Sequence, residues 1–384
     1  MDFSDSAEHE QLRTTVSAVT RSFGGTYFNE RAQRREPTTE LWQALSKQGF
    51  VGINMPEEFG GGGAGLAELA IVVEQTAAEG CPLLLLLVSS AICGEMIARY
   101  GTGEQRARWL PALADGSIKM AFAITEPDAG SNSHQLATTA RRDGDQWLLN
   151  GTKYYISGAD EAAAILVVTR SGTVGTTGDG LLSLFIVPTD APGLTLQPLP
   201  VAAMMPEKQF TVFFSDVQMG AGDLLGAEHE GFAQVFHGLN PERITGAALC
   251  VGIGRHALAR GAQYARTRQV WDTPIGAHQG VAHALAKALI EVEAAALLTA
   301  RAAWLHDHGQ PAGEAANMAK YAAAEAALAA VDAAIQTHGG NGMSAEYGLI
   351  PLWGIARLLR IAPVNREMIL NYVAQHSLRL PRSY

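Results

Sequence analysis

Hydroxyl, glycine and aromatic residues are concentrated between positions 121 and 159, and their types suit a flat ligand that carries phosphate. The segment begins with a short β-like run at 121–124 and continues into a turn-forming cluster at 125–132. It ends with the paired aromatics Tyr154 and Tyr155. Aromatic rings can cover the face of a heterocycle, while hydroxyl and backbone N–H groups can bind its edge and a diphosphate. The pattern therefore indicates a site for a planar cofactor.

Two motifs in this segment resemble the flavin-binding signatures of the acyl-CoA dehydrogenase family. The first reads Thr-Glu-Pro-Asp-Ala-Gly-Ser at 125–131, and the second reads Asn-Gly-Thr-Lys-Tyr-Tyr-Ile-Ser at 150–157. The resemblance covers essentially the whole chain and implies FAD as the cofactor. It also implies an N-terminal α-helical domain at 1–119, a middle β-barrel-like domain at 120–228 and a C-terminal four-helix bundle at 229–384.

The same resemblance implies roles for individual residues of the segment. Ser131 would serve the diphosphate or the pantetheine arm. Tyr155 would cover one ring face where many relatives have Trp, and Ser157 would replace the Thr near the reactive flavin nitrogen. The implied cofactor-binding residues of the segment are Phe122, Ile124, Thr125, Gly130, Ser131, Tyr155 and Ser157.

Further cofactor contacts are implied toward the C-terminus. The block Arg-Gln-Val-Trp at 268–271 with the later Gln, and the Gln-Thr-His-Gly-Gly-Asn-Gly block at 336–342, resemble segments that reach a cofactor across a subunit interface. The resemblance therefore implies an oligomer, most simply a homotetramer as in relatives. The implied residues of the C-terminal part are Arg268, Trp271, Gln279, Gln336, Gly339, Gly340, Asn365 and Glu367.

The family reaction removes an α-proton from a thioester, which requires a carboxylate base. Many relatives carry this base shortly after the second glycine block, but a gapless count reaches Pro363 there, which cannot accept a proton. A subgroup that includes the isovaleryl- and long-chain enzymes places a Glu-Arg pair early in the first bundle helix, where this chain has Glu242 and Arg243. Glu242 is therefore the candidate catalytic base.

A structural interpretation of Glu242 competes with the catalytic one. Asn240-Pro241 is typical of a helix start, and an acidic residue in the first turn interacts favourably with the helix dipole.

The implied substrate contacts are Ser131, Arg243, Ala362 and Pro363. Because proline has no N–H, one donor to the thioester oxygen is lost or is moved to Val364.

The predicted function is oxidation of an acyl-CoA thioester to trans-2-enoyl-CoA in fatty-acid breakdown, with electrons passed to an electron-transferring flavoprotein. Two alternatives remain open. One is a flavin monooxygenase or nitroalkane oxidase, since some relatives of the same fold have these activities. The other is a non-catalytic flavin-binding subunit of a hetero-oligomer.

The spacing of apolar residues predicts the elements that must position these groups. Helices with apolar residues three or four apart are expected at 41–45, 66–78, 84–100, 104–113, 244–266, 278–306, 313–337 and 349–375. Strands are expected at 121–124, 137–142, 146–153, 154–156, 164–169, 183–187, 194–199 and 209–217, with a turn at Asn150-Gly151 and a glycine-rich hairpin loop at 172–180.

Composition narrows the class of protein. The chain has 384 residues and a net charge of −10, which argues against a nucleic-acid partner because such proteins normally present a basic face. Three cysteines without metal spacing are expected to be buried in a reducing compartment, and no metal site is expected. The acidic N-terminus and short leucine run predict neither a leader peptide nor a membrane span, so a cytoplasmic location is expected.

Overall fold

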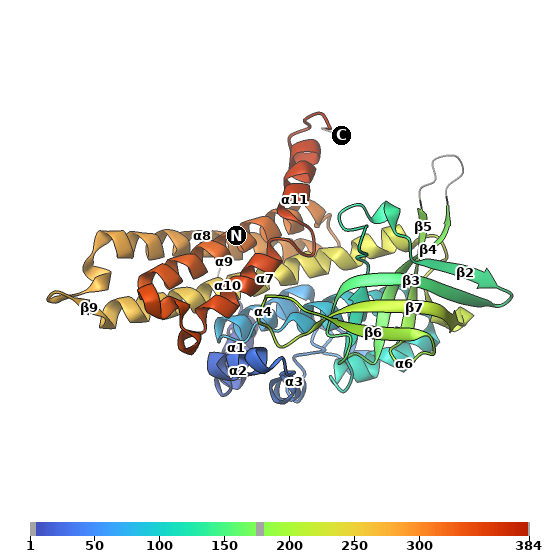
Figure 1. Ribbon diagram of the computed structural model, residues 1–384, viewed down its shortest axis with the longest axis horizontal. Coiled ribbons are helices and arrows are strands. Elements are labelled where there is room, and N and C mark those ends of the chain that lie inside the picture. Colours follow the sequence, from blue (N-terminus) through green and yellow to red (C-terminus); the bar gives the residue numbers. More distant parts are fainter. Residues whose placement is uncertain (1–4, 174–179, 383–384) are drawn as a thin grey trace.

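The computed structural model describes residues 5–173 and 180–382, which form an N-terminal helical group, a middle sheet and a C-terminal helical group. Figure 1 shows the sheet at one end of the long helices α7 (Gly231–Thr267), α8 (Gln279–Asp307) and α9 (Gly313–His338), with the N-terminal helices along their side. The helices of the first group are α1 (Ala7–Arg21), α2 (Gly24–Arg34), α3 (Thr39–Ser46), α4 (Leu66–Ala78), the π-helix η2 (Leu86–Gly94), α5 (Glu95–Tyr100) and α6 (Gly103–Ala114).

The middle sheet has the strand order β6-β7-β3-β2-β4-β5-β8, with β1 paired in parallel to β4. The predicted turn at Asn150-Gly151 is wrong, because one long strand passes through it and pairs with β7 on both sides. Gly151 lies at a register shift with a φ of 147°, so this glycine serves a bulge rather than a hairpin. The strands are β1 (Met120–Ala123), β2 (Thr139–Asp143), β3 (Gln146–Ser157), β4 (Ala164–Thr173), β5 (Gly180–Pro188), β6 (Leu194–Leu199), β7 (Gln209–Met219) and β8 (Leu224–Leu225).

The predicted loop at 172–180 lies mostly outside the described residues. At its edges, Thr173 and Gly180 pair with each other across β4 and β5.

The first C-terminal helix begins earlier than the helix expected at 244–266. Helix α7 (Gly231–Thr267) starts well before Pro241, which lies inside the helix. The prediction of a helix start at Asn240-Pro241 is therefore wrong, and Glu242 does not lie in a first turn. The preceding segment remains helical because Val235 is buried in the core between the sheet and the N-terminal helices.

The expected last helix at 349–375 is interrupted. Helix α10 (Leu349–Leu359) ends before a loop, and α11 (Arg366–Tyr372) begins with Asn365 as its N-cap. Pro363 interrupts the helical pattern because it lacks the N–H that a continuous helix needs. The predicted helices at 278–306 and 313–337 are confirmed as α8 (Gln279–Asp307) and α9 (Gly313–His338).

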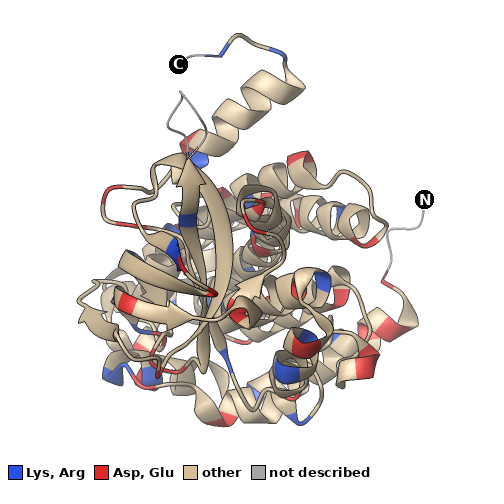
Figure 2. Ribbon diagram, turned by 90° about the vertical axis from the view of Figure 1, so that its right-hand side faces the viewer, with Lys and Arg blue, Asp and Glu red and all other residues tan. Residues whose placement is uncertain are grey.

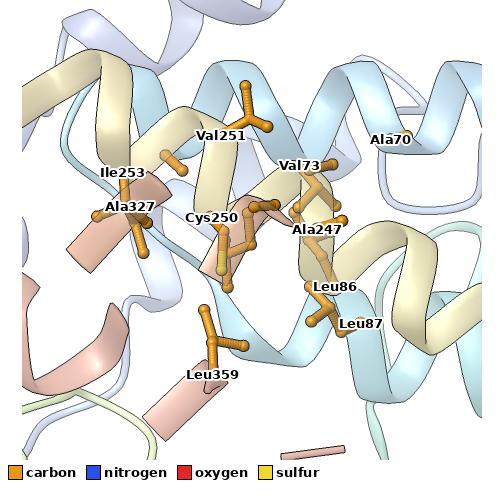
Figure 3. Close-up of a cluster of buried hydrophobic side chains, with 14 of the residues drawn as sticks. Ala70, Val73, Leu86, Leu87, Ala247, Cys250, Val251, Ile253, Ala327 and Leu359 are labelled. Carbon is orange, nitrogen blue, oxygen red and sulfur yellow. The ribbon is translucent and has the colours of Figure 1, made fainter. Parts of the chain in front are cut away.

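The helical core forms around α7. Figure 3 shows buried side chains of α4, η2, α7, α9 and α10 meeting there, among them Val73, Cys250 and Leu359. Gly252 permits the close approach of α7 to α4, because a Cβ at this position would overlap the carbonyl oxygen of Glu74. Core packing of this kind fixes which residues of α7 can face the sheet.

Charged residues of both signs are intermixed on the visible face in Figure 2. The three cysteines are buried and free, as expected. None of the helices in the described parts of the chain has the length and apolar character that crossing a membrane needs.

Candidate active site

A buried ion pair joins the two motifs. Lys153 Nζ lies 2.8 Å from Glu126 Oε1 and donates to the carbonyl of Ile124 at 2.9 Å, while Glu126 accepts from the N–H groups of Ala137 and Thr138. Burial lowers the pKa of Lys153 to about 8, although Glu126 opposes this shift. Burial opposes ionisation of Glu126, but Lys153 and the hydrogen bonds prevail and lower its pKa. The pair therefore holds the first motif against β3.

Tyr155 projects from an irregular part of β3. The register against β7 shifts between Lys153 and Ile156, and Tyr155 has a φ of 58°, which non-glycine residues rarely adopt. Its side chain is 55% exposed, and its ring makes an edge contact with Tyr154 at 4.4 Å between centroids. Backbone strain of this kind persists where the surrounding structure imposes it and is concentrated at functional sites. The exposed ring can cover the face of a planar ligand.

Hydrogen bonds position the polar residues beside Tyr155. Ser157 Oγ donates to Gln209 Oε1 at 3.0 Å. The carbonyl of Thr125 accepts from the N–H of Tyr154 at 2.8 Å, so the first motif lies beside the end of β3.

Phe122 and Ile124 lie on and just after β1, and both are half-buried. Phe122 packs against the helical core and against the core beneath the sheet, and Ile124 packs against the latter. These contacts place the end of β1 at the junction between the helices and the sheet.

The first motif also contacts the C-terminal helices. Asn365 Nδ2 donates to Ser131 Oγ at 2.7 Å, and Asn365 caps α11 by accepting from the N–H of Met368 at 2.8 Å. Gly130 is exposed with open space where a Cβ would lie, and Glu367 is exposed in the first turn of α11. The tertiary structure therefore brings Ser131 and Asn365 together although 234 positions separate them.

Glu242 is half-buried on α7. Burial raises its pKa to about 7, although the positive charges of Arg243 and Lys320 oppose the shift. The pKa of Cys93 in η2 is raised by burial and also by the charge of Glu242, and Cys93 Sγ lies 3.5 Å from the carbonyl oxygen of Ala121 in β1. The carboxyl group therefore lies close enough to Cys93 of η2 for its charge to act on the thiol. A group with this pKa can accept a proton near neutral pH.

Arg243 is 6% exposed and lies beside Glu242. Its Nη1 donates to Asn240 Oδ1 at 2.8 Å, whereas its Nε has no hydrogen-bond partner within the described residues. Burial lowers the pKa of Arg243, and Glu242 and Tyr372 oppose this shift. A buried donor without a partner is costly, which suits a ligand oxygen at this position.

Ala362 and Pro363 lie in the loop between α10 and α11; Ala362 is exposed and Pro363 is half-buried. This loop is held to α9 by Lys320, whose Nζ donates to the carbonyl of Val364 at 2.5 Å.

The remaining predicted cofactor residues lie at the other end of the molecule. Helix α7 has 37 residues and is about 55 Å long at 1.5 Å per residue. Figure 1 shows β9 (Gln269–Val270) at the end of the helices that is opposite the sheet. The C-terminal end of α9 is also there, because Asn341 donates to Tyr264 Oη at 3.0 Å. The exposed residues of this group are Arg268, Trp271, Gln279, Gln336, Gly339 and Gly340.

A separate cleft of about 850 Å³ lies beside the first part of α7. Tyr100, His237, Asn240 and His306 line it, and no predicted site residue does. Asp307, which also lines the cleft at the end of α8, accepts hydrogen bonds from the N–H groups of Leu66 and Ala67 and so caps the start of α4.

Comparison with known proteins identifies the family. Family models for the N-terminal, middle and C-terminal domains of acyl-CoA dehydrogenases match residues 6–117, 121–217 and 229–378. Acyl-CoA dehydrogenase FadE12 of Mycobacterium tuberculosis (strain ATCC 25618 / H37Rv) is 56% identical over 384 residues, which are 100% of this chain and 99% of that protein. The chain belongs to the acyl-CoA dehydrogenase family. The resemblance inferred from the two motifs is thus confirmed, as is the expected fold.

Solved structures superpose closely on the chain. A glutaryl-coenzyme A dehydrogenase in complex with glutaryl-CoA has a TM-score of 0.94 at 28% identity, covering 100% of this chain and 98% of that one. The FAD complex of PigA has a TM-score of 0.93 at 26% identity, covering 99% of this chain and 100% of that one. The acyl-CoA dehydrogenase described here is an FAD-dependent oxidoreductase.

The chain's own geometry fits FAD. An exposed ring at a strained bulge suits the flavin face, and the hydroxyl of Ser157 lies two residues further along β3. Gly130 near the sheet and Gly339 and Gly340 at the far end leave open space for a diphosphate to approach the backbone.

Residue patterns did not reveal every contributor to the site. The motifs predict no role for Lys320 or for the Glu126–Lys153 pair, although Glu126 and Lys153 are part of the two motifs. A charged Lys153 within the β-forming segment 146–156 is a usable signal, because a buried cation there needs an anionic partner. Lys320 gave a similar one, because it is a lone cation in the alanine-rich helix α9.

Proposed function

We propose that the chain catalyses α,β-dehydrogenation of an acyl-CoA thioester to trans-2-enoyl-CoA, with Glu242 as the base that removes the α-proton. The observation that carries this proposal is the environment of Glu242. Glu242 is half-buried, its charge acts on Cys93 of η2, and its pKa of about 7 suits a proton acceptor. FAD, when bound, supplies the acceptor for the β-hydride.

Other residues would bind and orient the substrate. Arg243 offers an unpaired donor beside the base, and Ser131 lies on the same side of the molecule as the loop that carries Ala362 and Pro363. Since Pro363 has no N–H, the N–H of Val364 is the nearest loop donor that could hold the thioester oxygen. Phe122, Ile124, Thr125 and Tyr155 would hold the flavin ring, together with Ser157.

A homotetramer is part of the proposal. The predicted cofactor residues lie at two ends of a helical group whose longest member, α7, is about 55 Å long, so the residues of one chain cannot surround one flavin. Arg268 and Trp271 from one copy would complete the site formed around Tyr155 and Asn365 in another. An electron-transferring flavoprotein as electron acceptor, a role in fatty-acid breakdown, a cytoplasmic location and domain boundaries after residues 119 and 228 stay predictions.

Replacement of the base tests the catalytic assignment. We expect Glu242→Gln to retain FAD but to reduce it about 10²–10⁴ times more slowly, because a neutral amide cannot accept the α-proton. The measurement is anaerobic bleaching of the flavin absorbance with a panel of acyl-CoA esters. Glu161→Gln is the matched control, since Glu161 is also half-buried but pairs with Lys119.

The outcomes separate the open alternatives. If no ester bleaches the wild-type flavin, the dehydrogenase proposal fails. Monooxygenase or nitroalkane-oxidase activity on the same fold, or a non-catalytic flavin-binding subunit, would then be the remaining interpretations. If Glu242→Gln bleaches at the wild-type rate, the base assignment fails and the reaction class stands.

A further inference from the structure

Lys320 is a buried cation that binds the loop after α10 and whose charge acts on the proposed base Glu242. It lies on α9 with 2% of its surface exposed. Its Nζ donates to the carbonyl of Val364 at 2.5 Å. Burying an ammonium group is costly unless hydrogen bonds and opposite charges compensate. The position therefore calls for an explanation beyond helix packing.

The hydrogen bond from Lys320 holds the peptide group that joins Val364 to Asn365. The carbonyl of Val364 and the N–H of Asn365 belong to one planar unit, so holding the first fixes the orientation of the second. Pro363 precedes this unit and cannot donate, whereas Asn365 binds Ser131 and caps α11. Lys320 thus anchors the loop at the point where it passes from the predicted substrate contacts to the predicted cofactor contacts.

The same ammonium also acts on Glu242. Its positive charge lowers the pKa of Glu242 against the effect of burial, and Glu242 in turn raises the pKa of Lys320. Burial outweighs this and brings the pKa of Lys320 to about 8. The titratable and charged groups that interact with Glu242 or Lys320 are Arg243 and Cys250 on α7, Cys93 on η2 and Glu325 on α9.

We propose that Lys320 is a positioning residue for the reaction, which orients the 363–365 loop and favours the ionised form of the base Glu242. The effect on Glu242 rests on the proposed function, whereas the effect on the loop does not. The loop contact is a property of the folded chain. The charge effect has a definite sign, because removing a positive neighbour makes a carboxylate harder to form and raises its pKa.

Two variants and one control test the proposal on the full-length holoenzyme. Lys320→Met removes the donor and the charge at similar volume, and Lys320→Arg keeps both. Lys119→Met is the control, because Lys119 is also shielded, with a side chain 12% exposed, and pairs with Glu161. Hydrogen–deuterium exchange of peptides covering 360–366 reports on the loop, and the pH dependence of flavin reduction reports on the base.

For Lys320→Met we expect about tenfold faster exchange in the loop, as for loss of one hydrogen bond to a charged group. We also expect the pKa that governs flavin reduction to rise by about one unit. Lys320→Arg should restore both, and Lys119→Met should change neither. If Lys320→Met does not fold, Lys320→Gln, which is too short to reach the carbonyl, carries the same expectations.

Unchanged loop exchange in a folded variant that lacks the ammonium would overturn the positioning role. An unchanged pH dependence of flavin reduction would overturn the effect of Lys320 on Glu242, even if the variant is less stable than the wild type. If no ester reduces the wild-type flavin, the proposed function fails instead, and the exchange measurement still decides the loop contact.

Discussion

At the residue scale, the burial of Glu242 links the stability of the protein to pH. The folded state raises the pKa of Glu242 from 4.5 to about 7, so it holds this proton more tightly than the unfolded chain does. The stabilising contribution of the protonated group is complete below pH 4.5 and is lost as the pH rises through 7. Above that pH the protein carries a buried charge at its site, which is the state a base requires.

We therefore expect Glu242→Gln to be more stable than the wild type above pH 7, by at most about 3 kcal/mol. The difference should shrink toward pH 4.5, because both side chains are then neutral. Thermal unfolding of the two proteins at pH 8 and pH 4.5 measures this. Glu293→Gln on the exposed side of α8 is the control. A stability difference that is the same at both pH values would contradict the assigned pKa.

At the element scale, strand β3 shows how local irregularity can serve a site. The strand is long and continuous, yet its register against β7 shifts twice, once near Gly151 and once around Tyr155. A bulge turns a side chain away from regular alternation. The second shift leaves the ring of Tyr155 exposed in a conformation that glycine would adopt more readily. Regular pairing would have directed this ring differently.

We expect Tyr155→Gly to lose FAD while the apoprotein unfolds at the same or a higher temperature. Glycine relieves the positive φ, offsetting about 1 kcal/mol of strain, but removes the ring proposed to cover the flavin. Flavin content per chain and the unfolding temperature of the apoprotein measure the two effects. Tyr155→Phe keeps the ring and should retain FAD. Full flavin content in the glycine variant would count against the proposed contact.

At the scale of the whole molecule, the helical bundle presents an apolar surface to solvent. Ile290, Leu297 and Trp304 lie seven residues apart on α8 and are 70%, 58% and 49% exposed. This spacing places them along one face of the helix. Trp271, near the far end of α7, is 84% exposed. Surfaces of this kind mark association sites, in agreement with a cofactor site that needs more than one copy.

We expect Leu297→Arg to yield smaller assemblies and to lose FAD, although Leu297 is not among the predicted flavin contacts. A charge at the apolar face would oppose association, and separated chains would lack the second group of cofactor residues. Light scattering after size-exclusion chromatography and flavin content measure this. Gln11→Glu on exposed α1 is the control. A variant that keeps FAD as a single chain would rule out the shared site.

Regular periodicity made most elements predictable. The helices at 66–78 and 313–337 and the strand at 194–199 agree with α4, α9 and β6 closely, because alternation of buried and exposed side chains is a local property. Two predictions from local sequence were wrong, the turn at Asn150-Gly151 and the helix start at Pro241. Each resembles a turn or helix start, but pairing with β7 and burial of Val235 outweigh these preferences.

The sequence by itself determined the family, the flavin cofactor and the candidate base, because motif residues near one another along the chain carry that chemistry in their types and order. Only the tertiary structure decided that Ser131 meets Asn365, that Lys320 holds Val364, and that the predicted flavin residues divide between two ends of the molecule. Such relations depend on how helices tens of ångströms long pack against one another. No short pattern along the chain contains that information.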